Sequence, residues 1–228
     1  MKKVILISVL LAAISPLLYA QFSLGAKAGM TVSNYNVRVK SKASVSYKAG
    51  LSARYMVSKF GVETGVYLKE AGSAYMQASL PPQNNKGGMV CVSVKSKYID
   101  IPLSLVYKYP IAEKVSLTLN AGGYVAFENG GICTIAHSMG TYAMDPFEGF
   151  DSRKLPTDQN FVPFTVKAAH KLDFGLVAGI GLEVSRFSIN ASYDLGVANV
   201  YDSYLPLTSD KNVRNRIFWI AAGYHFNL

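Results

Sequence analysis

Residues 172–197 read LDFGLVAGIGLEV-SR-FSINASYDLGV and contain two runs in which apolar side chains alternate with small or polar ones. In the run 172–184 every even-numbered residue is apolar, whereas the odd-numbered residues are glycine, valine or acidic. The run 187–197 repeats the pattern, and only Ser185 and Arg186 separate the two. Because successive side chains of a strand point to opposite faces, this stretch predicts a β-hairpin whose strands each have one apolar face.

The same alternation recurs in six other segments, at residues 22–37, 45–57, 60–68, 89–109, 115–127 and 214–228. Short connections fall at 58–59, 110–114 and 185–186, and long ones around 38–44, 78–88, 129–169 and 200–213. An even number of strands, with short turns on one side and long loops on the other, is typical of outer-membrane barrels. The sequence therefore predicts an all-β fold, an eight-stranded antiparallel up-and-down transmembrane β-barrel.

The composition agrees with a membrane barrel and excludes two other classes. Of 228 residues 50% are hydrophobic and 16% charged, and the mean hydropathy is +0.19, which excludes a disordered chain. After residue 20 no apolar run approaches the roughly 18 residues that a membrane helix needs, which excludes a helical bundle. The many Tyr (15), Phe (11) and Gly (19) residues favour β-structure.

The two faces of each predicted strand differ in a way that orients the barrel. An eight-stranded barrel is only wide enough for its own side chains, so the face rich in Gly, Ser and Ala fits inside and the large apolar residues meet lipid. A soluble barrel with the apolar face inside is the competing interpretation. The membrane orientation predicts a mixed-sign charge network in the lumen, made of Lys27, Arg54, Glu63, Lys69, Asp100, Asp173, Glu183 and Asp194.

The first twenty residues have the pattern of a secretory signal peptide. Lys2 and Lys3 precede the apolar run 4–14, and the segment ends on Ala20. We expect cleavage after Ala20 and export to the bacterial outer membrane, with residues 21–228 as the outer-membrane β-barrel domain. A buried N-terminal helix of the fold is the alternative.

The cysteines Cys91 and Cys133 predict a disulfide, because export leads to an oxidising compartment. In the predicted hairpin, pairing Tyr109 with Val115 sets the two cysteines directly opposite each other, at a separation that suits a disulfide. A bulge at the two glycines 130–131 would slip the register by one residue and turn Cys133 to the other face.

Four segments together resemble the PorT-type outer-membrane β-barrel family of Bacteroidota. They are FSLGAKAGM at 22–30, YIDIPL at 98–103, DFGLVAGIGLE at 173–183 and AGYHF at 222–226. The resemblance spans residues 22–228 and implies a compact outer-membrane barrel of the small OmpX and OmpA type. Because the family's namesake serves type IX secretion, it also implies a possible role as an accessory of that machinery, with secretion-machinery proteins as partners.

The residue types that support catalysis are scattered in this sequence. His137, His170 and His225 have no spacing that ties them to a serine or carboxylate, and there is no phosphate loop, metal-spaced cluster or dinucleotide fingerprint. We therefore expect no enzyme activity, no catalytic residue, no cofactor and no metal. An enzyme that modifies outer-membrane lipid is the remaining enzymatic alternative.

The excess of basic residues, with a net charge of +9, lies mostly in the predicted outside loops. Cations at the outer rim can pair with the anionic head groups of lipopolysaccharide, and a solvated crown without a ligand is the alternative. Nucleic acid is not an expected partner at a bacterial surface. The predicted rim that faces lipopolysaccharide consists of Arg38, Lys40, Lys42, Arg153, Lys154, Lys211 and Arg214.

Taken together, these features predict a structural or surface-binding module of the outer membrane that is neither an enzyme nor an open pore. A lumen this narrow should be filled by its own charged side chains. The segment 129–169 contains several aromatic residues among prolines, which favours a folded or partner-binding loop over a disordered spacer.

Overall fold

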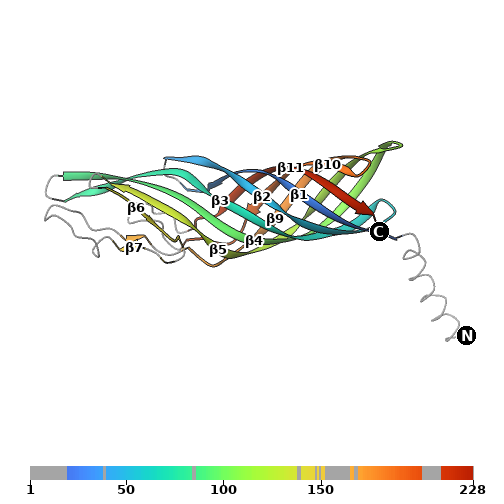
Figure 1. Cartoon of the computed structure of the whole chain (residues 1–228). Helices are drawn as coiled ribbons and strands as arrows, with labels where there is room; N and C mark the ends of the chain where they lie inside the picture. The colour runs from blue at the N-terminus through green and yellow to red at the C-terminus, as the bar shows by residue number, and fades with distance from the viewer. Residues whose placement is uncertain are drawn as a thin grey trace, which may run out of the picture.

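The computed structural model shows a closed β-barrel whose strands continue beyond the ring at one end (Figure 1). The structure describes residues 20–37, 40–83, 86–137, 140–146, 148, 150–151, 165–166, 169–201 and 212–227. Among the described residues, no helix is long and apolar enough to cross a membrane.

Eight antiparallel strands form the ring in chain order, which confirms the predicted fold class. They are β1 (Ala20–Tyr35), β2 (Lys40–Val57), β3 (Phe60–Gln83), β4 (Lys86–Ala112), β5 (Val115–His137), β9 (Leu172–Val184), β10 (Phe187–Gly196) and β11 (Asn215–Asn227). The first strand closes the ring, since Ala28 lies opposite Ala49 of β2 on one side and Ala222 of β11 on the other. Closure leaves no unpaired strand edge along the ring, as a barrel in lipid requires.

The short turns gather at one end of the barrel, where β1 begins and β11 ends (Figure 1). In two of these turns the first loop residue has the same φ, since Ser58 and Ser185 both have a φ of 57°. A positive φ at the first central residue suits the mirror-image turns that match the twist of a hairpin. This end corresponds to the periplasmic side of an outer-membrane barrel.

Three strands are far longer than a membrane crossing needs. β3, β4 and β5 have 24, 27 and 23 residues, whereas about 9–11 suffice to span the bilayer. β6 (Gly140–Met144) pairs with the outer half of β5, and β7 (Phe150–Asp151) pairs with β8 (Thr165–Val166). We call residues 70–83 of β3, 86–97 of β4 and 128–137 of β5, together with β6, the outer sheet.

The outer sheet corrects two predicted loops. Residues 78–88 belong largely to the paired ends of β3 and β4, and the segment 129–169 begins with the continuation of β5 and with β6. The alternation seen in the membrane continues here, as Val92, Val94 and Ile135 are completely buried on the inward face. Strand pairing rather than loop structure therefore satisfies the backbone of these segments.

The alternation of faces is confirmed along the ring. Leu176 and Ile180 point outward with 57% and 48% exposed surface, whereas Asp173 and Glu183 of the same strand are 0% and 4% exposed. Large apolar side chains form the outward band on every strand of the ring, and the charged residues predicted for the lumen point inward. The soluble-barrel interpretation, with its apolar face inside, is wrong.

The predicted register of the β4–β5 hairpin is wrong, and with it the reason for a disulfide. Tyr109 pairs with Leu117, not Val115, and beyond the bulge Cys91 lies opposite Ala136 while Cys133 lies opposite Val94. The two cysteines do not form a disulfide in the structure.

Two departures from the prediction cause this difference in register. β4 continues to Ala112 and the turn lies at Glu113 and Lys114, so Tyr109 pairs two residues further along β5 than predicted. A bulge at the glycine pair then shifts the pairing by one more residue. Gly130 has a φ of +81°, and the strand carries one extra residue between the pairs Tyr98–Glu128 and Ser96–Gly131. Glycine adopts this left-handed conformation without strain, as the first residue of one bulge type requires. The slip turns Cys133 into the buried face and leaves Cys91 half-exposed.

Candidate functional site

The eight charged side chains predicted for the lumen all lie inside the barrel. Seven of them belong to two layers of ion pairs, one nearer the short turns and one in the middle of the barrel, and Asp173 lies apart from both. In the layer nearer the short turns, Arg54 contacts two carboxylates. Its Nη2 lies 2.7 Å from Glu63 Oε2, and its Nη1 pairs with Glu183. Lys27 also pairs with Glu63, and Lys108 Nζ lies 2.7 Å from Glu183 Oε2. Each carboxylate therefore has two cationic partners.

The middle layer is a square of two lysines and two aspartates. Lys48 Nζ lies 2.8 Å from Asp100 and 3.4 Å from Asp194, and Lys69 Nζ lies 2.7 Å and 3.6 Å from the same two carboxylates. None of the four side chains is more than 2% exposed. Buried charges without partners are strongly disfavoured, so each member of the square requires the others.

Aromatic rings enclose this square. Lys48 Nζ lies 4.4 Å from the ring centre of Trp219, and Lys69 Nζ lies 4.1 Å from that of Tyr124. Such contacts between a cation and a ring face stabilise a charge most where water is excluded. The rings and ion pairs together hold both lysines in fixed positions.

Asp173 is held by neutral donors rather than by a cation. The Tyr124 hydroxyl donates to its Oδ2 at 3.2 Å, and the Asn215 side-chain amide donates to the same oxygen at 2.9 Å. This carboxyl is 0% exposed. It therefore connects β9 to β5 and β11 across the lumen.

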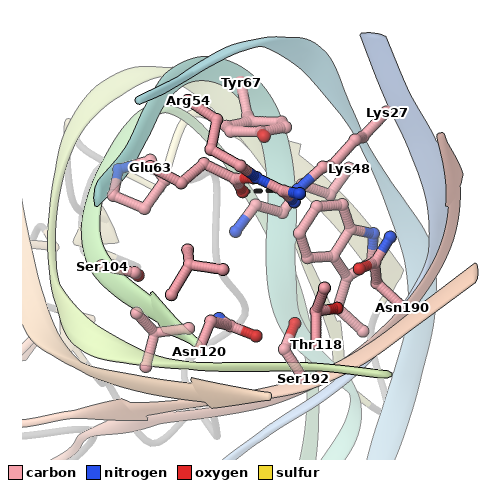
Figure 2. Close-up of a pocket in the computed structure, with 14 residues that line it drawn as sticks. Lys27, Lys48, Arg54, Glu63, Tyr67, Ser104, Thr118, Asn120, Asn190 and Ser192 are labelled. Carbon is pink, nitrogen blue, oxygen red and sulfur yellow. Dashed lines mark hydrogen bonds and ion pairs between the residues drawn. The ribbon is translucent and has the colours of Figure 1, made fainter. Parts of the chain in front are cut away.

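Little space remains between these layers. Figure 2 shows Arg54, Glu63 and Lys27 gathered on the wall made by β1 to β3, and shorter polar side chains such as Asn120 and Ser192 on the opposite wall. The cavity between them has a volume of about 30 Å³. A space of this size holds about two water molecules.

A tyrosine-rich cluster closes the lumen on the side of the outer sheet. Tyr35, Tyr98 and Tyr201 are 3%, 1% and 1% exposed, and they pack with the fully buried Val200 and Ile217. The rings of Tyr35 and Tyr201 meet edge to face at 5.9 Å. Within the part of the chain that the structure describes, the lumen is filled from this cluster to the inner layer of ion pairs.

The other mouth, at the short turns, is open to solvent. A basin of about 340 Å³ lies there, lined by Arg54, Lys59, Lys108, Glu183 and hydroxyl groups. Gln21, the residue that follows the predicted cleavage point, also lines it. We call this region the periplasmic basin.

The two histidines whose side chains the structure describes, His170 and His225, lie at opposite ends of the barrel. In the basin, His225 Nε2 lies 3.3 Å from Ser188 Oγ and 4.0 Å from Glu183 Oε1, so the hydroxyl and the carboxylate approach the same ring nitrogen. A base that is oriented for nucleophile activation has them on opposite nitrogens. His170 is exposed at the outer end of β9, far along the barrel axis from this basin. No cluster of metal-ligating side chains occurs among the described residues.

The predicted basic rim is only partly within the described residues. Lys40 and Lys42 are exposed at the start of β2, and Arg214 is half-buried just before β11. Four further members of the predicted rim lie outside the described residues, namely Arg38, Arg153, Lys154 and Lys211.

Sequence reasoning missed two cations of the lumen. Lys48 has the same strand parity as Arg54 and Lys108 has the same parity as Asp100, so the alternation contained the signal for both. Trp219, which packs on Lys48, shares the inward parity of Ile217 on the same strand.

The closed ring, the outward apolar band and the filled lumen define a small transmembrane β-barrel of the outer-membrane type. Residues 19–202 match the family model described as outer membrane protein beta-barrel domain. The chain belongs to this family and is an outer-membrane β-barrel protein.

Solved structures of small barrels are also similar to the chain. One is Ail, the attachment invasion locus protein of Yersinia pestis, which was solved in complex with the heparin analogue sucrose octasulfate. It is 15% identical to this chain with a TM-score of 0.41, and the match covers 90% of this chain and 99% of Ail. Neisserial surface protein A is 13% identical with a TM-score of 0.37, and the match covers 91% of this chain and 99% of that protein. No curated protein matches the chain.

Proposed function

We propose that the protein is a closed structural and surface-binding module of the outer membrane, not an open pore and not an enzyme. The observation that carries this proposal is the filled lumen, in which interlocked ion pairs leave about 30 Å³ beneath a tyrosine-rich cluster. A solute has no path through such an interior. The surface that remains for function is the outer sheet, the basic rim and the periplasmic basin.

The rim supports a polyanionic partner, and lipopolysaccharide is the polyanion that surrounds an outer-membrane barrel. Lys40 and Lys42 are exposed beyond the apolar band. Exposed cations attract phosphorylated head groups over about one Debye length, so the attraction weakens as salt increases.

The binding experiment uses full-length protein in nanodiscs and immobilised lipopolysaccharide. Neutralising the rim with Lys40→Gln and Lys42→Gln should weaken binding and reduce its dependence on salt. Lys59→Gln and Lys114→Gln remove the same charge at the opposite mouth and serve as the control. Equal binding by both double variants would reject the rim as a binding surface.

The second candidate function is that of a PorT-like accessory of type IX protein secretion. The periplasmic basin favours it, because a basin of about 340 Å³ with charged and hydroxyl groups gives a periplasmic protein a place to dock. Deleting the gene and comparing secreted and periplasmic proteins tests this candidate. Retention of cargo in the periplasm would support it, and an unchanged secretome would reject it. A change of lipid A structure on deletion would instead support a lipid-modifying enzyme.

We also propose that residues 1–20 are removed during export. The support is the sequence pattern, together with the position of Gln21 at the periplasmic basin, where the new N-terminus would lie. The intact mass of the protein purified from outer membranes decides the point. A mass that begins at Gln21 is expected, and a mass that includes Met1 would contradict cleavage.

A further inference from the structure

A groove lies on the outside of the barrel where the outer ends of β9, β10 and β11 meet. It encloses about 650 Å³, and its lining has two chemically different parts. Leu172, Phe174 and Val197 line the part within the lipid-facing band, and Lys171 and Arg214 line the part beyond it. The groove therefore crosses the boundary between the acyl chains and the head groups of the outer leaflet.

The apolar part is open to lipid. Leu172, Phe174 and Val197 are 43%, 45% and 44% exposed, and they come from the start of β9 and the segment that follows β10. Side chains that are apolar and outward-facing at the edge of the band can pack along an acyl chain.

The cationic part has charge that the described protein does not neutralise. No carboxylate of the described residues lies within ion-pair distance of Lys171 or Arg214, and Nε of Arg214 is buried without a hydrogen-bond partner. Lys95 differs, because its Nζ lies 3.7 Å from Glu70. Glu128 meets Lys171 through the backbone, since its N–H donates to the Lys171 carbonyl oxygen at 2.9 Å.

A further cation stands beside the groove. Arg216 lies opposite Leu195 at the outer end of the apolar band, and its guanidinium donates to the carbonyl oxygens of Gly196 and Asn215 at 2.8 and 2.9 Å. These bonds fix its charge close to the groove without cancelling it. The outer ends of β9 and β11 thus carry fixed positive charge directly above exposed apolar side chains.

We propose that this groove binds one phosphorylated glycolipid of the outer leaflet. Lys171 and Arg214 bind a phosphate of the glucosamine head group, and an acyl chain lies along Leu172, Phe174 and Val197. Arginine and lysine form strong charge-assisted bonds to phosphate, and the apolar part adds the burial that a free phosphate or sugar does not provide. This inference rests on the proposed function, because it places the outer sheet at the cell surface.

The experiment counts lipids on the full-length protein by native mass spectrometry from detergent micelles. The probes are diphosphoryl lipid A, the same lipid with its phosphates removed, and soluble glucosamine 1-phosphate as a competitor. The wild type should retain one diphosphoryl lipid A in preference to the dephosphorylated lipid. The variant Lys171→Gln with Arg214→Gln should retain it about tenfold more weakly.

Two controls make the result specific. Lys59→Gln with Lys114→Gln removes the same charge at the opposite mouth of the barrel and should retain lipid like the wild type. Lys171→Arg with Arg214→Lys keeps both charges and should also retain it, which separates lost binding from lost folding.

Three outcomes would overturn the proposal. They are equal retention of both lipid forms by the wild type, equal loss in the two glutamine double variants, and displacement of the lipid by glucosamine 1-phosphate at similar concentration. None of them affects the salt-dependent binding of the rim to lipopolysaccharide, so the proposed function can stand if this inference fails.

Discussion

Replacing Lys69 by methionine removes one of the two cations that neutralise Asp100 and Asp194 in the middle of the lumen. Lys69 is 1% exposed, and methionine fills nearly the same space, so the change is mainly a loss of charge. Lys48 then faces both carboxylates alone, at 2.8 and 3.4 Å. Removing one partner of a buried pair costs about 3–5 kcal/mol, and because Lys48 remains we expect a loss of about 3 kcal/mol in the free energy of unfolding.

The matched control is the same substitution at a pair whose lysine is exposed and whose carboxylate keeps another partner, because the Ser46 hydroxyl donates to Glu70 at 2.9 Å. Lys95 is 49% exposed and its Nζ lies 3.7 Å from Glu70, so Lys95→Met should cost less than about 1 kcal/mol. Combining Lys69→Met with Asp100→Asn restores the charge balance and should recover part of the loss. The recovered part measures the coupling between the two residues.

The protein supplies its own reporter for this experiment. Trp219 is the only tryptophan, and it packs on Lys48 within the middle layer. Its emission during urea unfolding in lipid vesicles gives the free energy of each variant. Equal losses for Lys69→Met and Lys95→Met would refute the reasoning that the lumen excludes water from its ion pairs.

Two further predictions test orientation and register. Ile180→Arg, on the lipid face near mid-strand, should lower the free energy of unfolding by about 2–4 kcal/mol. Ser192→Ala, on the inward face, should lower it by less than about 1 kcal/mol. Equal urea midpoints for the two variants would contradict the orientation. Thiol labelling of denatured, unreduced protein should modify both Cys91 and Cys133, and protection of both until reduction would show that the bulged register is wrong.

The sequence was sufficient for the fold because the barrel uses one simple rule along its whole length. A period of two residues, combined with a lumen too narrow for large side chains, determines which face Lys27 and Asp100 must occupy. The same rule extends to Lys48 and Lys108. The rule gives the face of each lysine but not its ion-pair partners, because those partners lie on other strands across the barrel.

Register was the part that the alternation could not determine. Pro110 reads as the beginning of a turn, but in the structure it lies at a bulge, and β4 continues to Ala112 before the turn at Glu113 and Lys114. A second bulge at Gly130 then inverts the faces beyond it. The displaced turn shifts the pairing by two residues at Tyr109, and the bulge at Gly130 adds one more, so the predicted opposition of the cysteines failed although their strands do pair.

The groove at the outer ends of β9, β10 and β11 was also beyond sequence reasoning. Arg214 belonged to the predicted rim, but its neighbours in the groove, such as Lys171 and Val197, come from separate segments. Only closure of the ring brings these segments together. The face that each side chain occupies was thus predictable from its own strand, whereas the contacts between residues of distant strands were not.

The central claim is that the lumen is filled by its own side chains, and single-channel recording in planar bilayers tests it most directly. Folded wild-type protein should give no stable conductance steps, because the square of Lys48, Lys69, Asp100 and Asp194 and the tyrosine-rich cluster above it leave no continuous water path. Heat-unfolded protein serves as the control for insertion artefacts. Large, stable and reproducible steps from the folded protein alone would contradict the claim.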